Sequence, residues 1–244
     1  CDRGARLRQV ACPAAGGGAV SELIVGVVPI RSFREGKTRL ASILTGDQRA
    51  ALLRRTASRV VCTLAASQIV DTTLVVSSER EVLEWAAEMG RRVTPLRQPD
   101  ERPGLNGALD AARAWALDRD ADALLSLFAD LPAVSTHDVR TLVRQGSPVV
   151  LGADRRGEGT NAMLLRLAGA GEQFRFAFGG GSLEKHLAEA ARLDLAANVV
   201  MAHGLGFDLD TPADWEEFMQ GEQPLAWQRD LFALPALRCG AVSS

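Results

Sequence analysis

Short apolar runs alternate with longer amphipathic segments along most of this chain. The first run, Leu23–Val28, is apolar throughout and rich in β-branched residues, which is typical of a strand covered on both faces. The segment from Asp47 to Ser67 follows, and its apolar residues are spaced so that they share one helical face. Because strands and helices keep alternating, the pattern predicts an α/β fold with one mainly parallel mixed sheet and helices on both faces.

The same patterns locate the remaining elements. Strands are expected near Val93 and at residues 73–76, 121–128, 149–151, 162–167 and 199–201. Helices are expected at residues 79–89 and 106–117, from Ser135 onward, after Ser182, and over residues 212–218. Ser135 and Asp138 form an acidic version of the capping box, and Pro212 suits a first helical turn.

One domain accounts for this pattern. The 244 residues are 47% hydrophobic, enough for one sizeable core, and they contain neither an internal repeat nor a linker. We therefore expect a single domain over residues 21–220. Residues 1–20 are rich in Ala, Gly and Arg without periodicity, which predicts a disordered extension. Residues 221–244 carry Gly, Pro and Ser among scattered apolar residues, and we expect a C-terminal tail or arm.

Charge and composition narrow the functional classes. The formal net charge is -2 without a basic block, which argues against nucleic acid as the main partner. No apolar run approaches the roughly 20 residues that a membrane span needs, so we expect no membrane insertion. The cysteines form neither a close pair nor a metal-binding pattern, which favours a reducing cytoplasm over a disulfide framework. These cysteines are Cys1, Cys12, Cys62 and Cys239.

A basic loop follows the first strand. Residues 29–40 include Arg31, Arg34, Lys37 and Arg39. In an open α/β sheet, loops at the carboxyl ends of strands build the ligand site, and Lys and Arg there can bind phosphates. The Gly-x4-Gly-Lys-Ser/Thr spacing of a Walker A loop is absent. From this loop alone, phosphate binding and a solvated basic surface are equally compatible with the sequence.

Three aspartates later in the chain are candidate metal ligands. Asp130 follows the apolar run 124–129, whereas Asp208 and Asp210 are two positions apart, so that in an extended segment both face the same side. Carboxylates suit Mg2+, a hard cation that shares its coordination shell with substrate phosphates. An N-cap or a turn before Pro132 is the structural alternative for Asp130, and a helix cap is the alternative for Asp210.

Two further segments have the composition of anion-binding turns. Residues 159–161 offer the Thr160 hydroxyl, an amide side chain and an unhindered glycine. The glycines at 179–181 lead into a helix at Ser182, where backbone N–H groups and the helix dipole attract anions. A surface loop and a plain N-cap are the structural alternatives. His186, in the same helix, is expected to be a packing residue.

Six motifs in order resemble a known family. They are Lys37-Thr38-Arg39-Leu40, Gly104-Leu105-Asn106, Asp130-Leu131-Pro132, Gly159-Thr160-Asn161, Phe178-Gly179-Gly180-Gly181-Ser182 and Asp208-Leu209-Asp210-Thr211-Pro212. Together they resemble the phospholactate/phosphoenolpyruvate guanylyltransferases of deazaflavin coenzyme F-420 biosynthesis. The resemblance implies a nucleotide-diphospho-sugar-transferase-like fold of the glycosyltransferase-A type. It also implies a Mg2+-dependent reaction that joins GTP to phosphoenolpyruvate, 2-phospho-L-lactate or 3-phosphoglycerate and releases pyrophosphate.

The resemblance further implies roles for individual residues and partners. The catalytic residues would be Lys37, Arg39 and Asp130, and the GTP-binding residues would be Arg31, Lys37, Arg39 and Asn106. The phospho-acid would be bound by Thr160, Gly179 and Ser182, and Mg2+ by Asp130, Asp208 and Asp210. The implied partners are GTP, the small phosphorylated acid and a downstream transferase of the same pathway.

Two other functions remain compatible with the motifs. A nucleotidyltransferase that acts on a sugar phosphate or on molybdopterin needs the same cations and carboxylates. A non-catalytic GTP-binding regulator would keep the pocket without turnover. The sequence does not choose among the three acids, because their small differences are worth only about 1–3 kcal/mol in a pocket. It also leaves the oligomeric state open.

Overall fold

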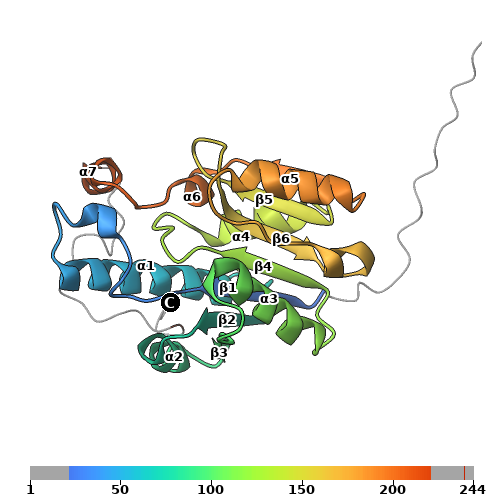
Figure 1. Ribbon diagram of the computed structural model, residues 1–244, viewed down its shortest axis with the longest axis horizontal. Helices are drawn as coiled ribbons and strands as arrows, with labels where there is room; N and C mark the ends of the chain where they lie inside the picture. The colour runs from blue at the N-terminus through green and yellow to red at the C-terminus, as the bar shows by residue number, and fades with distance from the viewer. Residues whose placement is uncertain (1–21, 221–238, 240–244) are drawn as a thin grey trace, which may run out of the picture.

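The computed structural model describes residues 22–220 and Cys239. In that part of the chain, a seven-stranded sheet has the order β3-β2-β1-β4-β6-β5-β7 (Figure 1). The strands are β1 (Ile24–Pro29), β2 (Thr72–Ser77), β3 (Val93–Arg97), β4 (Ala123–Leu127), β5 (Val149–Ala153), β6 (Thr160–Arg166) and β7 (Ala197–Val200). The α-helices are α1 (Gly46–Ala66), α2 (Arg80–Ala87), α3 (Gly104–Leu117), α4 (Thr136–Arg144), α5 (Ser182–Arg192), α6 (His203–Gly206) and α7 (Pro212–Gln220). The 3-10 helices are η1 (Thr38–Leu40) and η2 (Gly169–Gln173).

Strand β6 runs against its neighbours. It pairs antiparallel with β4 and β5, whereas the pairs β1–β2, β1–β4, β2–β3 and β5–β7 are parallel. The predicted mainly parallel mixed sheet is therefore confirmed. Because β6 is reversed, its amino end at Thr160 lies at the same sheet edge as the carboxyl end of β4, where Leu127 pairs with Ala162.

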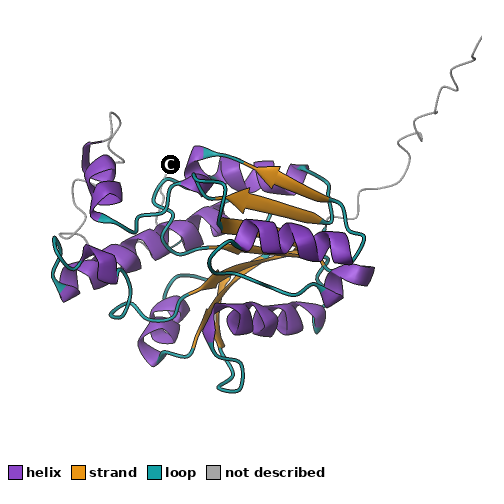
Figure 2. Cartoon of the chain, turned by 45° about the horizontal axis from the view of Figure 1, so that its top comes forward, coloured by secondary structure: helices purple, strands orange, loops and turns teal. Residues whose placement is uncertain are grey.

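Helices cover both faces of the sheet, as predicted (Figure 2). Side chains alternate along β1, because successive residues of a strand point to opposite faces. Ile24 and Val28 join an apolar cluster with residues of α1, α2 and α4. Val25 and Val27 join a second cluster with residues of α3 and α5. Both faces of β1 are thus buried, which explains its uninterrupted apolar sequence.

Local structure agrees with the sequence-based predictions where the sequence pattern is strong. The predicted capping box opens α4: Asp138 N–H donates to Ser135 Oγ at 3.3 Å, and Ser135 N–H donates to Asp138 Oδ2 at 2.9 Å. Strand β3 carries Pro95 at the edge of the sheet, where a missing N–H breaks no central ladder. The short elements η1, η2 and α6 were not predicted, because three to five residues carry no periodicity.

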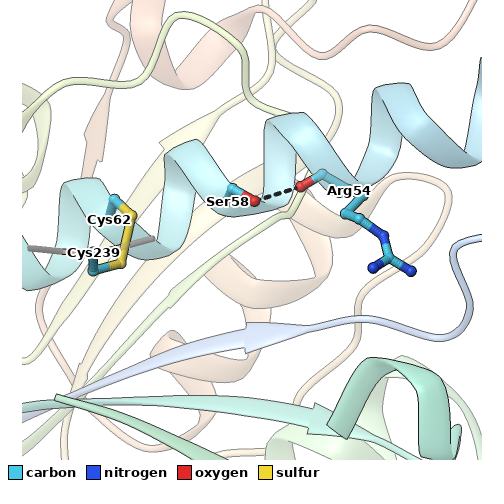
Figure 3. The surroundings of a disulfide bond; sticks show 4 residues. All are labelled: Arg54, Ser58, Cys62 and Cys239. Atoms are coloured by element: carbon cyan, nitrogen blue, oxygen red, sulfur yellow. Dashed lines mark hydrogen bonds between the residues drawn. A yellow bond between two sulfur atoms is a disulfide. The ribbon is translucent and has the colours of Figure 1, made fainter. Parts of the chain in front are cut away.

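A disulfide joins Cys62 to Cys239 across 177 positions (Figure 3). Cys62 lies on α1, and the Cys239 N–H donates to the Met89 carbonyl oxygen at 2.8 Å, just after α2. The expectation that the cysteines form no disulfide is wrong for this pair. Sequence spacing carries no sign of the bond, because the fold alone brings the two Cα atoms to 4.9 Å.

The predicted extension over residues 1–20 lies outside the described residues, as does the predicted tail over 221–244 apart from Cys239. Among the described helices, none has both the length and the apolar composition that crossing a membrane requires.

Candidate active site

A cavity of about 880 Å³ opens at the carboxyl edge of the sheet. The loops after β1, β2, β3 and β4 form much of its wall, as expected for a ligand site in an open α/β sheet. The lining residues used below are Arg31, Lys37, Gln98, Phe128, Asp130 and Asp210. The cavity therefore brings the predicted basic loop together with two of the predicted carboxylates.

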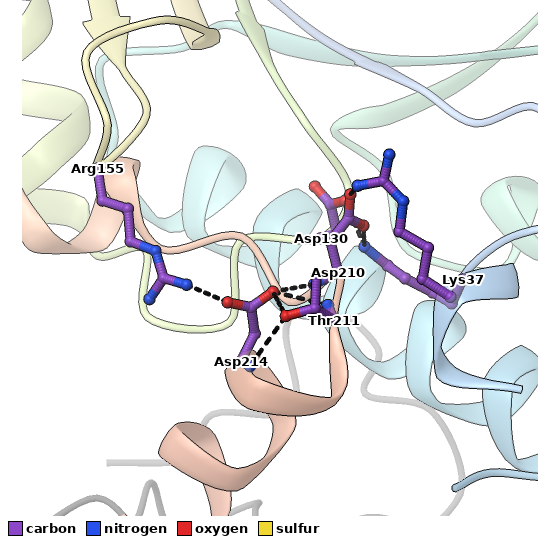
Figure 4. A network of polar contacts seen from close by, with 7 residues as sticks. Lys37, Asp130, Arg155, Asp210, Thr211 and Asp214 are labelled. Carbon is purple, nitrogen blue, oxygen red and sulfur yellow. Dashed lines mark hydrogen bonds and ion pairs between the residues drawn. The ribbon is translucent and has the colours of Figure 1, made fainter. Parts of the chain in front are cut away.

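Lys37 lies between two aspartates that are distant in sequence (Figure 4). Its Nζ donates to Asp130 Oδ2 at 2.5 Å and to Asp210 Oδ1 at 2.7 Å, and its side chain is only 4% exposed. Burial lowers the pKa of Lys37, but Asp130 and Asp210 raise it by more, so the net pKa lies above its ordinary value. The ammonium group therefore stays charged between the two carboxylates, which we call the acidic pair.

Asp130 keeps one carboxylate oxygen without a partner among the described residues. Its Oδ2 accepts from Lys37, whereas its Oδ1 is buried and accepts no hydrogen bond. Asp130 does not cap α4, because Ser135 has that role. A buried carboxylate oxygen is costly to leave unpaired, so Oδ1 indicates that a cation or donor completes this site.

Asp208 lies close to the same charges. Burial raises the pKa of Asp208, and the carboxylates of Asp130 and Asp210 raise it further, whereas Lys37 lowers it. Leu209, between Asp208 and Asp210, is fully buried. With the Leu209 side chain buried, the carboxylates of Asp208 and Asp210 both lie near the Lys37 charge.

One apolar cluster contains residues from both the Lys37 segment and the Asp210 segment. Its buried members are Leu40, Leu44, Leu52, Phe207, Leu209 and Phe218. Leu40 ends η1, three residues after Lys37, and Leu209 precedes Asp210. Packing of these two leucines in one cluster therefore fixes the basic loop against the segment of Asp210.

The hydrogen bonds that cap α7 do not involve the Asp210 carboxylate. Asp214 N–H donates to Thr211 Oγ1 at 3.2 Å, and Thr211 N–H donates to Asp214 Oδ2 at 2.6 Å. Arg155 donates to Asp214 Oδ1 (Figure 4). Arg155 also donates to Glu217 Oε2 at 2.7 Å. The cap role considered for Asp210 thus belongs to Thr211 and Asp214.

The arginines of the basic loop differ from Lys37 in exposure. The Arg31 side chain is 87% exposed and pairs with Glu35 at 3.1 Å. The Arg39 side chain is 73% exposed, with Nη1 3.9 Å from Asp210 Oδ2. Both guanidinium groups can move toward an anion without breaking a buried contact, which fits phosphate binding, and Arg31 also lines the cavity.

Asn106 contacts protein backbone in this structure. Phe178 N–H donates to Asn106 Oδ1 at 2.9 Å, and Asn106 Nδ2 donates to the Phe178 carbonyl oxygen at 3.4 Å. Asn106 thereby ties the first turns of α3 to the segment before the glycines. A direct contact between Asn106 and GTP stays a prediction.

Two of the three residues predicted to bind the acid, Thr160 and Ser182, form a buried pair. Thr160 N–H donates to Ser182 Oγ at 2.9 Å, and both residues are at most 2% exposed. Gly181, not Ser182, is the N-cap of α5. The exposed Gly179 adopts a φ of +126°, which side chains rarely allow. The structure thus brings Thr160 and Ser182 together, and their contact with an acid stays a prediction.

His186 connects this pair to the segment before the glycines. Its Nε2 accepts from Ala177 N–H at 3.0 Å, so the neutral ring carries its hydrogen on Nδ1, 3.1 Å from Thr160 Oγ1. Burial, with a smaller contribution from the charge of Lys185, lowers the pKa of His186 to about 4. The packing role expected for His186 is confirmed, because the ring is fully buried, but its polar contacts were not predicted.

The donor set fits Mg2+ bound together with a nucleotide. Within residues 22–220, no group of three His, Cys, Asp or Glu side chains converges closely enough to hold a metal ion by itself. Mg2+ commonly takes one or two carboxylates and completes its shell with waters and substrate phosphates. Asp130 and Asp210, with the unpaired Asp130 Oδ1, supply such a partial set.

The sequence patterns missed Gln98, which shapes the cavity at the end of β3. Its Nε2 donates to the carbonyl oxygens of Arg102 at 2.6 Å and Gly104 at 2.7 Å, which holds the β3–α3 loop closed. Only a short strand near Val93 was predicted, so its end at Arg97, and with it the position of Gln98 at the sheet edge, was not recognised.

Solved structures share this fold. A chain from Desulfovibrio desulfuricans, provisionally named a nucleotide-diphospho-sugar transferase, superposes with a TM-score of 0.69 at 16% identity, covering 85% of this chain and 91% of that one. The 4-diphosphocytidyl-2C-methyl-D-erythritol synthase of Anaerococcus prevotii has a TM-score of 0.55 at 12% identity, covering 80% and 95%. The nucleotide-diphospho-sugar-transferase-like fold predicted from the motifs is confirmed.

Sequence relatives are more specific. A phosphoenolpyruvate guanylyltransferase of Sphaerobacter thermophilus is 38% identical over 84% of this chain and 97% of its own length. A 2-phospho-L-lactate guanylyltransferase of Methanothermobacter thermautotrophicus is 31% identical over 79% of this chain and 82% of its own length. The family model described as "Guanylyl transferase CofC like" matches residues 24–228. The chain therefore belongs to the CofC-like guanylyl transferase family.

Proposed function

We propose that this protein transfers the guanylyl group of GTP to the phosphate of a three-carbon acid, phosphoenolpyruvate, 2-phospho-L-lactate or 3-phosphoglycerate, in coenzyme F-420 biosynthesis. The observation that carries the proposal is the convergence of Lys37, Asp130 and Asp210 in a cavity large enough for a nucleotide. Relatives that span most of this chain carry the names of this reaction with two of these acids.

The reaction needs no protein nucleophile. A phosphate oxygen of the acid attacks the α-phosphorus of GTP, the bond from that phosphorus to the bridging oxygen breaks, and pyrophosphate leaves with the electron pair. The two substrates are both anions, so the protein must offset their repulsion while it aligns them. Lys37 and Arg31 line the cavity and the exposed Arg39 lies near Asp210, so the three cations are proposed to bind the triphosphate.

Mg2+ is part of the proposal. When bound, it would neutralise the phosphates as a Lewis acid. Asp130 and Asp210 would hold it, with Asp208 beside them. The segment of Thr160, Gly179 and Ser182 is proposed to bind the acid, because it stands beside the cavity wall and contains backbone N–H groups at the start of α5.

The experiment that tests this function lets the three acids compete as acceptors of the guanylyl group. The purified protein is given GTP, Mg2+ and equal amounts of the three acids, and mass spectrometry identifies the guanosine diphosphate-linked product. Parallel reactions contain CTP in place of GTP, or a sugar phosphate or molybdopterin as acceptor. We expect pyrophosphate and one dominant guanylylated acid. Tight GTP binding without pyrophosphate release from any acceptor would instead identify a regulator.

We also propose that the product passes to a downstream transferase and that the reaction takes place in the cytoplasm, where GTP is available. In that compartment Cys62 and Cys239 would be exposed to a reducing environment. Measuring the thiol content of the protein isolated from its own cells under alkylating conditions tests the location independently of activity.

A further inference from the structure

The Lys37 ammonium occupies the space between the two carboxylates that would hold a divalent ion. Its contacts of 2.5 Å with Asp130 and 2.7 Å with Asp210 are as close as hydrogen-bonded ion pairs allow. An ion on the two oxygens that Lys37 contacts, Asp130 Oδ2 and Asp210 Oδ1, must take the position of Nζ, and an ion on Asp130 Oδ1 would face the ammonium across the same carboxylate. The lysine is built into the chain, so this competition is always present.

The structure also shows what holds Lys37 in that position. Lys37 has a φ of +56°, a left-handed conformation that few residues other than glycine adopt, and it directly precedes η1. Leu40 anchors the other end of η1 in the apolar cluster. The backbone therefore aims this side chain inward, whereas the neighbouring Arg39 points to solvent.

We infer that Lys37 acts as an internal cation that keeps divalent ions off the acidic pair until nucleotide phosphates draw it away. Free protein then binds Mg2+ weakly, and GTP and Mg2+ bind with positive coupling through this one side chain. By linkage, each ligand strengthens the binding of the other by the same factor. The inference rests on the proposed nucleotide site, but its metal test needs neither GTP nor an acceptor.

Because the protein contains so few lysines, the movement of the Lys37 side chain away from the carboxylates can be observed in the natural protein. Lys37 and Lys185 are the two lysines among the 244 residues, and Lys185 is exposed with Nζ on the Gly180 carbonyl oxygen. Lysine labelled with 13C at Cε therefore gives two NMR signals, which Lys185→Arg assigns. We expect GTP, with EDTA or with Mg2+, to shift the Lys37 signal, and Mg2+ alone to leave it in place at the same concentration.

A second measurement uses Mn2+ as the probe on nucleotide-free protein. Electron paramagnetic resonance counts the free Mn2+ during titration of wild type, Lys37→Met and Arg39→Gln. We expect Lys37→Met to bind Mn2+ about tenfold more tightly than wild type. Arg39→Gln is the matched control, because it removes a cation 3.9 Å from Asp210 without vacating the space between the carboxylates.

Two results would overturn the inference. The first is a failure of the Mn2+ titration to single out Lys37. Wild type and Lys37→Met would then have equal affinity for Mn2+, or Lys37→Met and Arg39→Gln would gain the same affinity, as general charge repulsion would cause. The second is an NMR signal of Lys37 that does not shift in saturating Mg2+ and GTP. If Lys37→Met does not fold, the NMR experiment on wild type decides alone. Loss of guanylyl transfer would not affect the Mn2+ comparison.

Discussion

Asn106 and Phe178 hold each other through two hydrogen bonds, although they lie 72 positions apart in sequence. Asn106 stands in the first turns of α3, beside the cavity, and Phe178 precedes the glycines at 179–181. The Phe178 ring also lies 5.3 Å from the ring of Phe128, which lines the cavity. The wall of the nucleotide cavity and the segment proposed to bind the acid are thus one connected structure.

The first prediction concerns this connection. Asn106→Ala leaves the Phe178 N–H without its partner, a loss of about 1–3 kcal/mol, and frees the glycine segment. We expect the KM for the acid to rise about tenfold, which corresponds to about 1.4 kcal/mol. Asn106→Asp keeps an oxygen for the shorter bond and should stay near wild type. Steady-state kinetics with each substrate varied measure the effect, and an unchanged KM for the acid would contradict the prediction. An additional rise in the KM for GTP would support the predicted contact between Asn106 and GTP.

The second prediction concerns Asp130. Asp130→Asn keeps the shape but removes the charge that faces Lys37, and we expect kcat to fall by about 10²- to 10³-fold. Asp47→Asn is the control, because that side chain is 98% exposed on α1 and should leave kcat unchanged. Circular dichroism of both variants checks the fold. Wild-type kcat in a folded Asp130→Asn protein would remove Asp130 from the proposed metal site.

The third prediction concerns stability against pH. His186 has a folded pKa of about 4, whereas in the unfolded chain it titrates near 6.5. The unfolded state therefore binds a proton first as the pH falls, so the stability that the neutral ring contributes is intact above pH 6.5 and declines toward pH 4. Between pH 7.5 and pH 5 this loss is about 2 kcal/mol.

Urea unfolding of wild type and His186→Gln at both pH values measures this loss. The variant lacks the titrating ring. The unfolding free energy of wild type minus that of His186→Gln should therefore be about 2 kcal/mol smaller at pH 5 than at pH 7.5. His137→Gln, on the surface part of α4, is a control for general effects of histidine loss. A difference that stays constant with pH would show that the buried ring does not titrate as described.

The fourth prediction concerns the bond between Cys62 and Cys239. A cross-link over 177 positions removes chain entropy from the unfolded state, which is commonly worth about 2–4 kcal/mol. We expect dithiothreitol to lower the unfolding free energy of oxidised wild type by that amount and to leave Cys62→Ser unchanged. Equal sensitivity of the two proteins to the reductant would assign the effect to another cysteine.

Much of the fold was predictable because its signals are local. The buried strand β1 and the capping box of Ser135 and Asp138 depend on neighbouring residues. The approach of Lys37 to Asp130 was also predictable, since the parallel strands β1 and β4 bring their carboxyl ends to one edge.

Other features depend on tertiary placement and could not be predicted. Sequence patterns do not show that the Lys37 ammonium contacts both carboxylates directly, since that depends on the backbone conformation before η1. The bonds between His186 and Thr160 and between Asn106 and Phe178 join segments far apart in the chain. Such contacts follow from how α3, β6 and α5 pack, which no local period encodes.

The reversed direction of β6 has a consequence for how such proteins diversify. Loops after β1, β2, β3 and β4 line the cavity proposed for the nucleotide, whereas the β5–β6 hairpin and the start of α5 contribute no residue to that lining. The hairpin turn over residues 154–159 lies outside the register between β4 and β6. Changes in this turn are therefore expected to alter the proposed acid side while the proposed nucleotide cavity keeps its lining.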